Sequence, residues 1–78
     1  MDFAPGSRVI CTHPGPWEGG YGDELAPAFN EVCTIREIVT PGKGGVIGLR
    51  FVEIINEDRA YADGLREAWF MAHRFRAA

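Results

Sequence analysis

Apolar and polar residues alternate along three segments of the chain, and each segment predicts a β-strand. The segments are residues 8–13, 31–39 and 46–55. The alternation slips by one position at residues 36–37, so that Ile38 can also turn inward, as a β-bulge allows. The side chains expected to face the core are Val9, Cys11, Cys33, Ile35, Leu49 and Phe51.

Proline and glycine separate these segments, with ten Gly and five Pro in the chain, as is typical of a small barrel or sandwich. Residues 4–7 and 40–43 each centre on Pro-Gly, which predicts a type II β-turn before the first strand and, extended by residues 44–45, a hairpin before the third. Residues 14–30 are too rich in Pro and Gly for regular structure and predict a long loop, with one helical turn allowed at residues 23–26.

The pattern of residues 65–73 fits either a helix or a strand. Leu65, Ala68, Trp69 and Ala72 have the spacing of an apolar helical stripe. The aromatic run that begins at Trp69 instead suits a strand that would cover an open sheet edge. The pattern alone leaves both alternatives open.

Composition and charge narrow the possible functions. The 78 residues are 46% hydrophobic and form a single small domain, and the net charge of −3 disfavours binding to phosphate backbones or anionic lipid. The longest apolar run, residues 68–72, is far shorter than the roughly 20 residues of a membrane span. The first residues do not resemble a secretory signal, so we expect a soluble cytoplasmic protein, without a membrane role, in which Cys11 and Cys33 stay reduced.

Four motifs follow one another along nearly the whole chain. They are Phe3-x-Pro5-Gly6-x-x-Val9-x-Cys11, Cys33-Thr34-Ile35-x-x-Ile38, Gly48-Leu49-x-Phe51, and an aromatic followed by Arg74-Phe75-Arg76. Together they resemble small bacterial and phage-encoded SH3-like barrel proteins, whose functions are mostly unknown. The chain departs from that pattern at Cys33, where the family often has an aromatic, and at Ala77, where it has Pro.

The resemblance implies an all-β fold, a five-stranded antiparallel SH3-like barrel. It favours a strand near residues 68–71, a 3₁₀ turn at residues 72–75 and a short last strand, and it makes residues 14–30 the long first loop. By analogy it also implies a partner protein in a phage-like or regulatory setting. Every matched motif is a folding signal, so the resemblance implies no activity.

No catalytic or metal-binding pattern stands out. Cys11, His13, Cys33 and His73 have the right chemistry for a zinc tetrahedron, but they lack the paired spacings that let one turn supply two ligands. Both thiols lie in apolar strand contexts, which disfavour a reactive thiolate. The glycines of residues 19–22 lack the Lys-Ser/Thr that follows a phosphate-binding loop. We predict a protein that is not an enzyme, with no catalytic residues, cofactor or metal.

Peptide recognition is the function we favour. The long loop offers flat aromatic anchors next to acidic residues, and this combination suits an extended partner segment that contains proline or basic residues. The alternative is that the aromatics fold back over the mouth of the barrel as a satellite cluster. The predicted partner-binding residues are Trp17, Glu18, Tyr21, Asp23, Glu24 and Phe29.

Weak nucleic-acid binding is the second hypothesis. A strip of arginines beside Phe or Trp would suit the binding of single-stranded nucleic acid, although the net negative charge predicts low, salt-sensitive affinity. The strip consists of Arg36, Arg50, Arg66, Arg74 and Arg76. Self-association through an open sheet edge is a further possibility.

Overall fold

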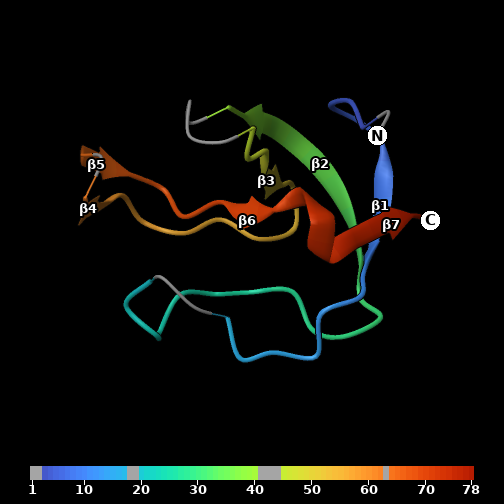
Figure 1. The fold of residues 1–78 in the computed structure, drawn as a ribbon, viewed down its shortest axis with the longest axis horizontal. Helices are drawn as coiled ribbons and strands as arrows, with labels where there is room; N and C mark the ends of the chain where they lie inside the picture. The colour runs from blue at the N-terminus through green and yellow to red at the C-terminus, as the bar shows by residue number, and fades with distance from the viewer. Residues whose placement is uncertain (1–2, 18–19, 41–44, 63) are drawn as a thin grey trace.

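Short strands make up nearly all the regular structure in the computed structural model of the chain, which describes residues 3–17, 20–40, 45–62 and 64–78 (Figure 1). No α-helix occurs in these residues, so the all-β prediction is confirmed. The elements are β1 (Arg8–Cys11), β2 (Val32–Val39), β3 (Gly48–Phe51), β4 (Arg59–Tyr61), β5 (Gly64–Arg66), β6 (Phe70–Met71), the 3₁₀ helix η1 (Ala72–Arg74) and β7 (Phe75–Ala77).

Five strands form one antiparallel sheet in the order β6-β3-β2-β1-β7. The predicted turn leads into β1: the Ser7 amide donates to the Ala4 carbonyl oxygen at 2.9 Å, and Gly6 has a φ of 92°. The predicted bulge is also present, because the register of β2 against β3 shifts between Ile35 and Glu37. Ile38 consequently packs against the core, as expected.

The prediction of a closed barrel is wrong. β6 and β7 are the two edges of the sheet and do not pair with each other. η1 joins them directly, so they follow one another along a single chain path instead of lying side by side (Figure 1). The strand near residues 68–71, the 3₁₀ turn and the short last strand, which the resemblance implied, are all present, and the helical reading of residues 65–73 is wrong.

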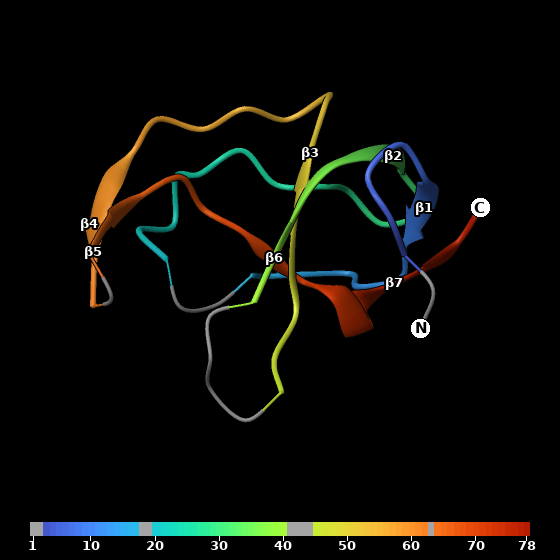
Figure 2. The same cartoon turned by 90° about the horizontal axis from the view of Figure 1, so that it is seen from above.

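A second, two-stranded sheet, which the sequence pattern did not predict, is formed by β4 and β5. This hairpin projects from the end of the molecule opposite both chain termini (Figure 2). The third predicted strand is shorter than expected, since only residues 48–51 of 46–55 pair. The allowed helical turn at residues 23–26 does not form, and the Pro-Gly centre of the predicted second turn, within 41–44, lies outside the described residues.

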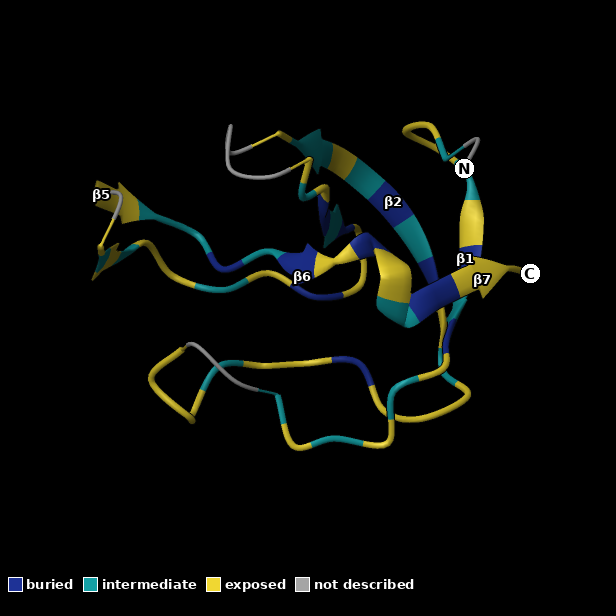
Figure 3. Ribbon diagram, in the orientation of Figure 1, coloured by how far each residue is buried: buried dark blue, intermediate teal, exposed yellow. Residues whose placement is uncertain are grey.

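The six side chains predicted to face inward are all buried, with at most 1% of their surface exposed. Ile54, Phe70, Ala72 and Phe75 complete the core (Figure 3). Cys11 and Cys33 are free thiols inside it. Burial, together with the nearby carboxylates of Glu31 and Glu53, raises the pKa of the Cys33 thiol to about 12.

Candidate functional site

A groove of about 450 Å³ opens between the long loop and the chain that runs from β4 to η1. The loop follows this part of the chain along the length of the molecule (Figure 1). The two walls therefore come from segments that are far apart in the sequence. The side chains that give the groove its character are Trp17, Tyr61, Arg66, Trp69, Met71 and Arg74.

Trp17 joins the loop wall of the groove to the core. Its indole packs edge-on against Phe70, with ring centres 5.1 Å apart, and stacks near Phe75 at 6.0 Å. The indole Nε1–H donates to the carbonyl oxygen of Pro27 at 3.3 Å. This aromatic folds back over the sheet, as the alternative reading of the loop allowed, and presents only part of its surface to the groove.

Trp69 forms part of the opposite wall and was not predicted as a site residue. Its indole lies so close to the buried Gly48 that a Cβ added there would come within 2.5 Å of the ring. The guanidinium of Arg66 lies 5.1 Å from this ring and 4.0 Å from that of Tyr61. A glycine inside a strand often marks a place where another group approaches the backbone closely. Gly48 was therefore the signal in the sequence that a bulky side chain packs against β3.

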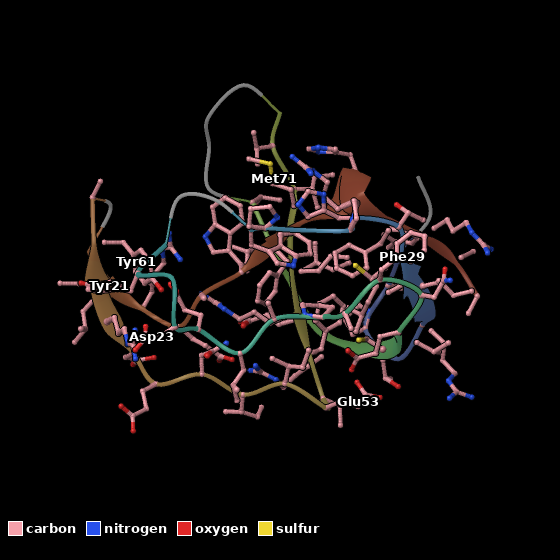
Figure 4. The ribbon with its side chains drawn as sticks, turned by 90° about the horizontal axis from the view of Figure 1, so that it is seen from below. Tyr21, Asp23, Phe29, Glu53, Tyr61 and Met71 are labelled. Atoms are coloured by element: carbon pink, nitrogen blue, oxygen red, sulfur yellow. The ribbon has the colours of Figure 1, made fainter. Side chains whose placement is uncertain are left out.

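Tyr21 and Asp23 attach the loop to the β4–β5 hairpin at one end of the groove (Figure 4). The Tyr21 ring meets Tyr61 edge-on at 5.5 Å, and its hydroxyl donates to the carbonyl oxygen of Ala60. Both carboxylate oxygens of Asp23 accept from Arg59, and this hydrogen-bonded guanidinium lowers the pKa of Asp23. Both side chains thus make intramolecular contacts.

Glu24 lines the groove, but its carboxylate is engaged within the molecule. It accepts hydrogen bonds from the Tyr61 hydroxyl at 2.6 Å and from the amides of Tyr21 and Gly22, each at 2.9 Å. Partial burial opposes ionisation of Glu24, yet these hydrogen bonds outweigh it and lower its pKa. Burial and the bond to Glu24 together raise the pKa of Tyr61 to about 12, so the phenol stays a donor.

The remaining predicted loop residues do not join this site. Phe29 lies at the other end of the molecule from Tyr21 and Asp23, with 57% of its surface exposed (Figure 4). Glu18 lies outside the described residues. Of the predicted set, Trp17 and Glu24 line the groove, and Tyr21 and Asp23 lie beside it.

The five predicted arginines of the nucleic-acid strip occupy different surroundings. Arg36 pairs with Glu67 at 2.6 Å, and Arg50 pairs with Glu37 at 2.7 Å. Arg76 is exposed on β7. Only Arg66 and Arg74 line the groove.

Arg74 reaches the groove from η1, next to two imidazoles. Its Nη1 lies against both ring nitrogens of His13, and its Nε lies 3.0 Å from Nε2 of His73. His13 Nε2 also faces the carbonyl oxygen of Pro16 at 3.0 Å. We therefore assign the His13 proton to Nε2, which leaves Nδ1 to accept from Arg74.

The side chains considered for zinc do not form a site. Cys11 Sγ faces the carbonyl oxygens of His13 and Pro27, at 3.5 and 4.0 Å. In the part of the chain that the structure describes, no three His, Cys, Asp or Glu side chains come together as ligands for a metal ion.

Comparisons with family profiles, with curated proteins and with solved structures found no match to this chain. None of the described segments is a helix with the length and apolarity needed to cross a bilayer.

Proposed function

We propose that this protein is a small, non-enzymatic interaction module that binds an extended peptide segment of a partner protein in the groove. The observation that carries the proposal is the pair of indoles, Trp17 and Trp69, in one groove with Tyr61 and Met71. Grooves lined by aromatic side chains accept extended, proline-containing segments at low entropic cost. The volume of about 450 Å³ is within the range of ligand sites in proteins.

The partner would lie between the loop and β6, instead of on the outer surface of residues 14–30. Trp17 and Glu24 give the loop wall, and the opposite wall comes from the chain between Tyr61 and Arg74. We also propose an SH3-like relationship, of the bacterial or phage-encoded kind. It is supported by the strand order and by the 3₁₀ turn between the last two strands. The two buried, unpaired thiols favour a reducing compartment such as the cytoplasm.

Selection from a displayed library of random peptides of about ten residues tests the proposal, with affinities then measured by tryptophan fluorescence. We expect enriched peptides whose affinity falls about tenfold in Met71→Ala, because Met71 lines the groove. Val52→Ala is the matched control, since Val52 is also an exposed apolar side chain but lies outside the groove. Failure to enrich any peptide, or equal effects of the two substitutions, would contradict the proposal.

Nucleic-acid binding is the competing outcome, favoured by the position of Arg66 and Arg74 beside the indoles. A labelled single-stranded oligonucleotide separates the two functions. Binding at about 50 mM salt that is lost by about 200 mM, together with no peptide enrichment, would replace the peptide proposal with this one.

A further inference from the structure

The two acidic residues of the loop that the structure describes are not available to a basic partner. Asp23 is bound by Arg59, and Glu24 by Tyr61 and two backbone amides. A lysine or arginine of a peptide would have to displace these contacts before it could pair. The charge preference that the loop sequence predicts is therefore not the one that its folded form offers.

Arg74 is a half-buried cation in the groove, and it has no anionic partner among the residues that the structure describes. None of the ion pairs among the described residues includes Arg74, and its hydrogen bonds go to the imidazoles of His13 and His73. Its Nη2 donates to no acceptor in the described part of the chain. A guanidinium bonds most strongly to a carboxylate, through two parallel N–H···O bonds.

We propose that the groove selects an acidic peptide, with Arg74 pairing with an Asp or Glu side chain of the bound segment; this rests on the proposed peptide-binding function. The backbone of the segment would lie along the indoles of Trp17 and Trp69. Its carboxylate would meet Arg74 at the η1 end of the groove. The charge of the bound segment is the reverse of the basic one that the sequence predicts.

The backbone at Arg74 is held independently of its guanidinium, so the side chain can be changed. The carbonyl oxygen of Arg74 accepts from the amide of Thr12 at 2.8 Å and from its hydroxyl at 2.9 Å. Arg74→Gln should therefore keep the fold. Arg74→Lys keeps the positive charge but cannot form the two parallel N–H···O bonds of a guanidinium. Arg76→Gln is the matched control, because it removes one positive charge from an exposed position on β7 outside the groove.

The experiment uses the peptide most enriched by wild-type protein, synthesised with an amidated C-terminus, and a copy in which its acidic residue is replaced by the amide. We expect the acidic residue at a fixed position, and a loss of about tenfold or more when it becomes an amide. Arg74→Gln should abolish this difference, Arg74→Lys should retain part of it, and Arg76→Gln should leave it unchanged.

Each other outcome has a definite meaning. Enriched peptides with basic or neutral residues at that position would overturn the charge selection and leave the peptide-binding function standing. Loss of binding on amidation alone would assign the contact to a terminal carboxylate and overturn the side-chain pairing. The pairing would also be overturned if Arg74→Gln, shown to be folded by an unchanged circular dichroism spectrum, still bound the acidic peptide more tightly than its amide copy by the wild-type factor. If no peptide is enriched, the proposed function fails as well.

Discussion

At the scale of single residues, the absence of a side chain at Gly48 allows the Trp69 indole to pack in one wall of the groove. The Trp69 indole occupies the space that a Cβ at Gly48 would need. We expect Gly48→Ala to lower the free energy of unfolding by about 1–3 kcal/mol, because either the indole or β3 must move. Urea denaturation followed by circular dichroism measures this change.

Trp69→Ala supplies the control for this prediction. It destabilises the protein by itself, but it also vacates the space beside Gly48. Adding Gly48→Ala to Trp69→Ala should therefore cost much less than adding it to the wild type. An equal cost in both backgrounds would show that the indole contact is not the reason.

The two thiols give a second prediction at this scale. Cys11 and Cys33 are fully buried, and the pKa of Cys33 is raised to about 12. Near pH 8, a thiol reagent should modify the native protein only as fast as the chain opens, whereas urea should expose both thiols at once. Modification of the native protein at the rate of a free thiol would contradict the buried placement.

Alternation along β1, β2 and β3 was sufficient to predict the core residues of these strands, but not the side chains of the groove. A period of two fixes the inward face of a strand, as for Cys33 and Ile35. Trp17 lies in a loop, where no period determines which way a side chain folds. Trp69 lies in a segment whose pattern fitted two structures, so its contact with Gly48 could not be derived.

At the scale of elements, the loop is attached to the β4–β5 hairpin and to the segment that precedes it by contacts between residues more than thirty positions apart. The amide of Leu25 donates to the side-chain oxygen of Asn56 at 2.8 Å, and the Asn56 amide group donates to the Leu25 carbonyl oxygen at 2.9 Å. Glu24 bonds to Tyr61 and Asp23 to Arg59 in the same region. Strands as short as β4 and β5 carry no periodic signal, so the sequence indicated neither the hairpin nor its partner.

This attachment should weaken in acid. The pKa values of Asp23 and Glu24 are lowered in the folded state, from ordinary values of 3.8 and 4.5. Their stabilising effect is therefore complete above those values and is lost as the pH falls through the lower, folded-state values. Between about pH 5 and pH 3, the amides of Tyr21 and Gly22 should lose hydrogen-exchange protection before the amides of β1 and β2 do.

Two substitutions check this assignment. Glu24→Gln should weaken the protection of the Tyr21 and Gly22 amides already near pH 7, because a neutral amide is a poorer acceptor than a carboxylate. Glu57→Gln removes an exposed carboxylate of the chain before β4 that is not a hydrogen-bond acceptor for the Tyr21 or Gly22 amide, and it should have no effect. Simultaneous loss of protection in loop and sheet would show that the loop does not open separately.

At the scale of the whole molecule, the sequence predicted the strands of the five-stranded sheet but not whether the two edges of this sheet pair to close a barrel. Pro-Gly turns and alternating strands specify a curved antiparallel sheet, yet they do not specify whether its edges meet. Here β6 and β7 remain separate edges. Aromatic packing fills the space near them, with the Phe51 and Phe75 ring centres 5.0 Å apart.

Glu67 connects parts of the molecule that the backbone pairing of the sheet does not join. Its carboxylate accepts from Arg36 of β2 at 2.6 Å and from the amide of Asn56 at 3.2 Å. Its carbonyl oxygen accepts from Arg50 of β3 at 2.8 Å. The single residue Glu67, in the chain that precedes β6, is therefore bonded to two central strands and to the segment that leads into the hairpin.

Glu67→Gln should consequently lower the free energy of unfolding by about 1–3 kcal/mol, because it leaves the charge of Arg36 unpaired beside a carboxylate position that is only 14% exposed. Glu37→Gln is the matched control: it also removes a carboxylate from an arginine, but Glu37 is 52% exposed and its loss should cost less than about 1 kcal/mol. Urea denaturation of both variants measures the difference. Equal costs would mean that the Glu67 carboxylate adds no more to the stability of the molecule than a surface ion pair does.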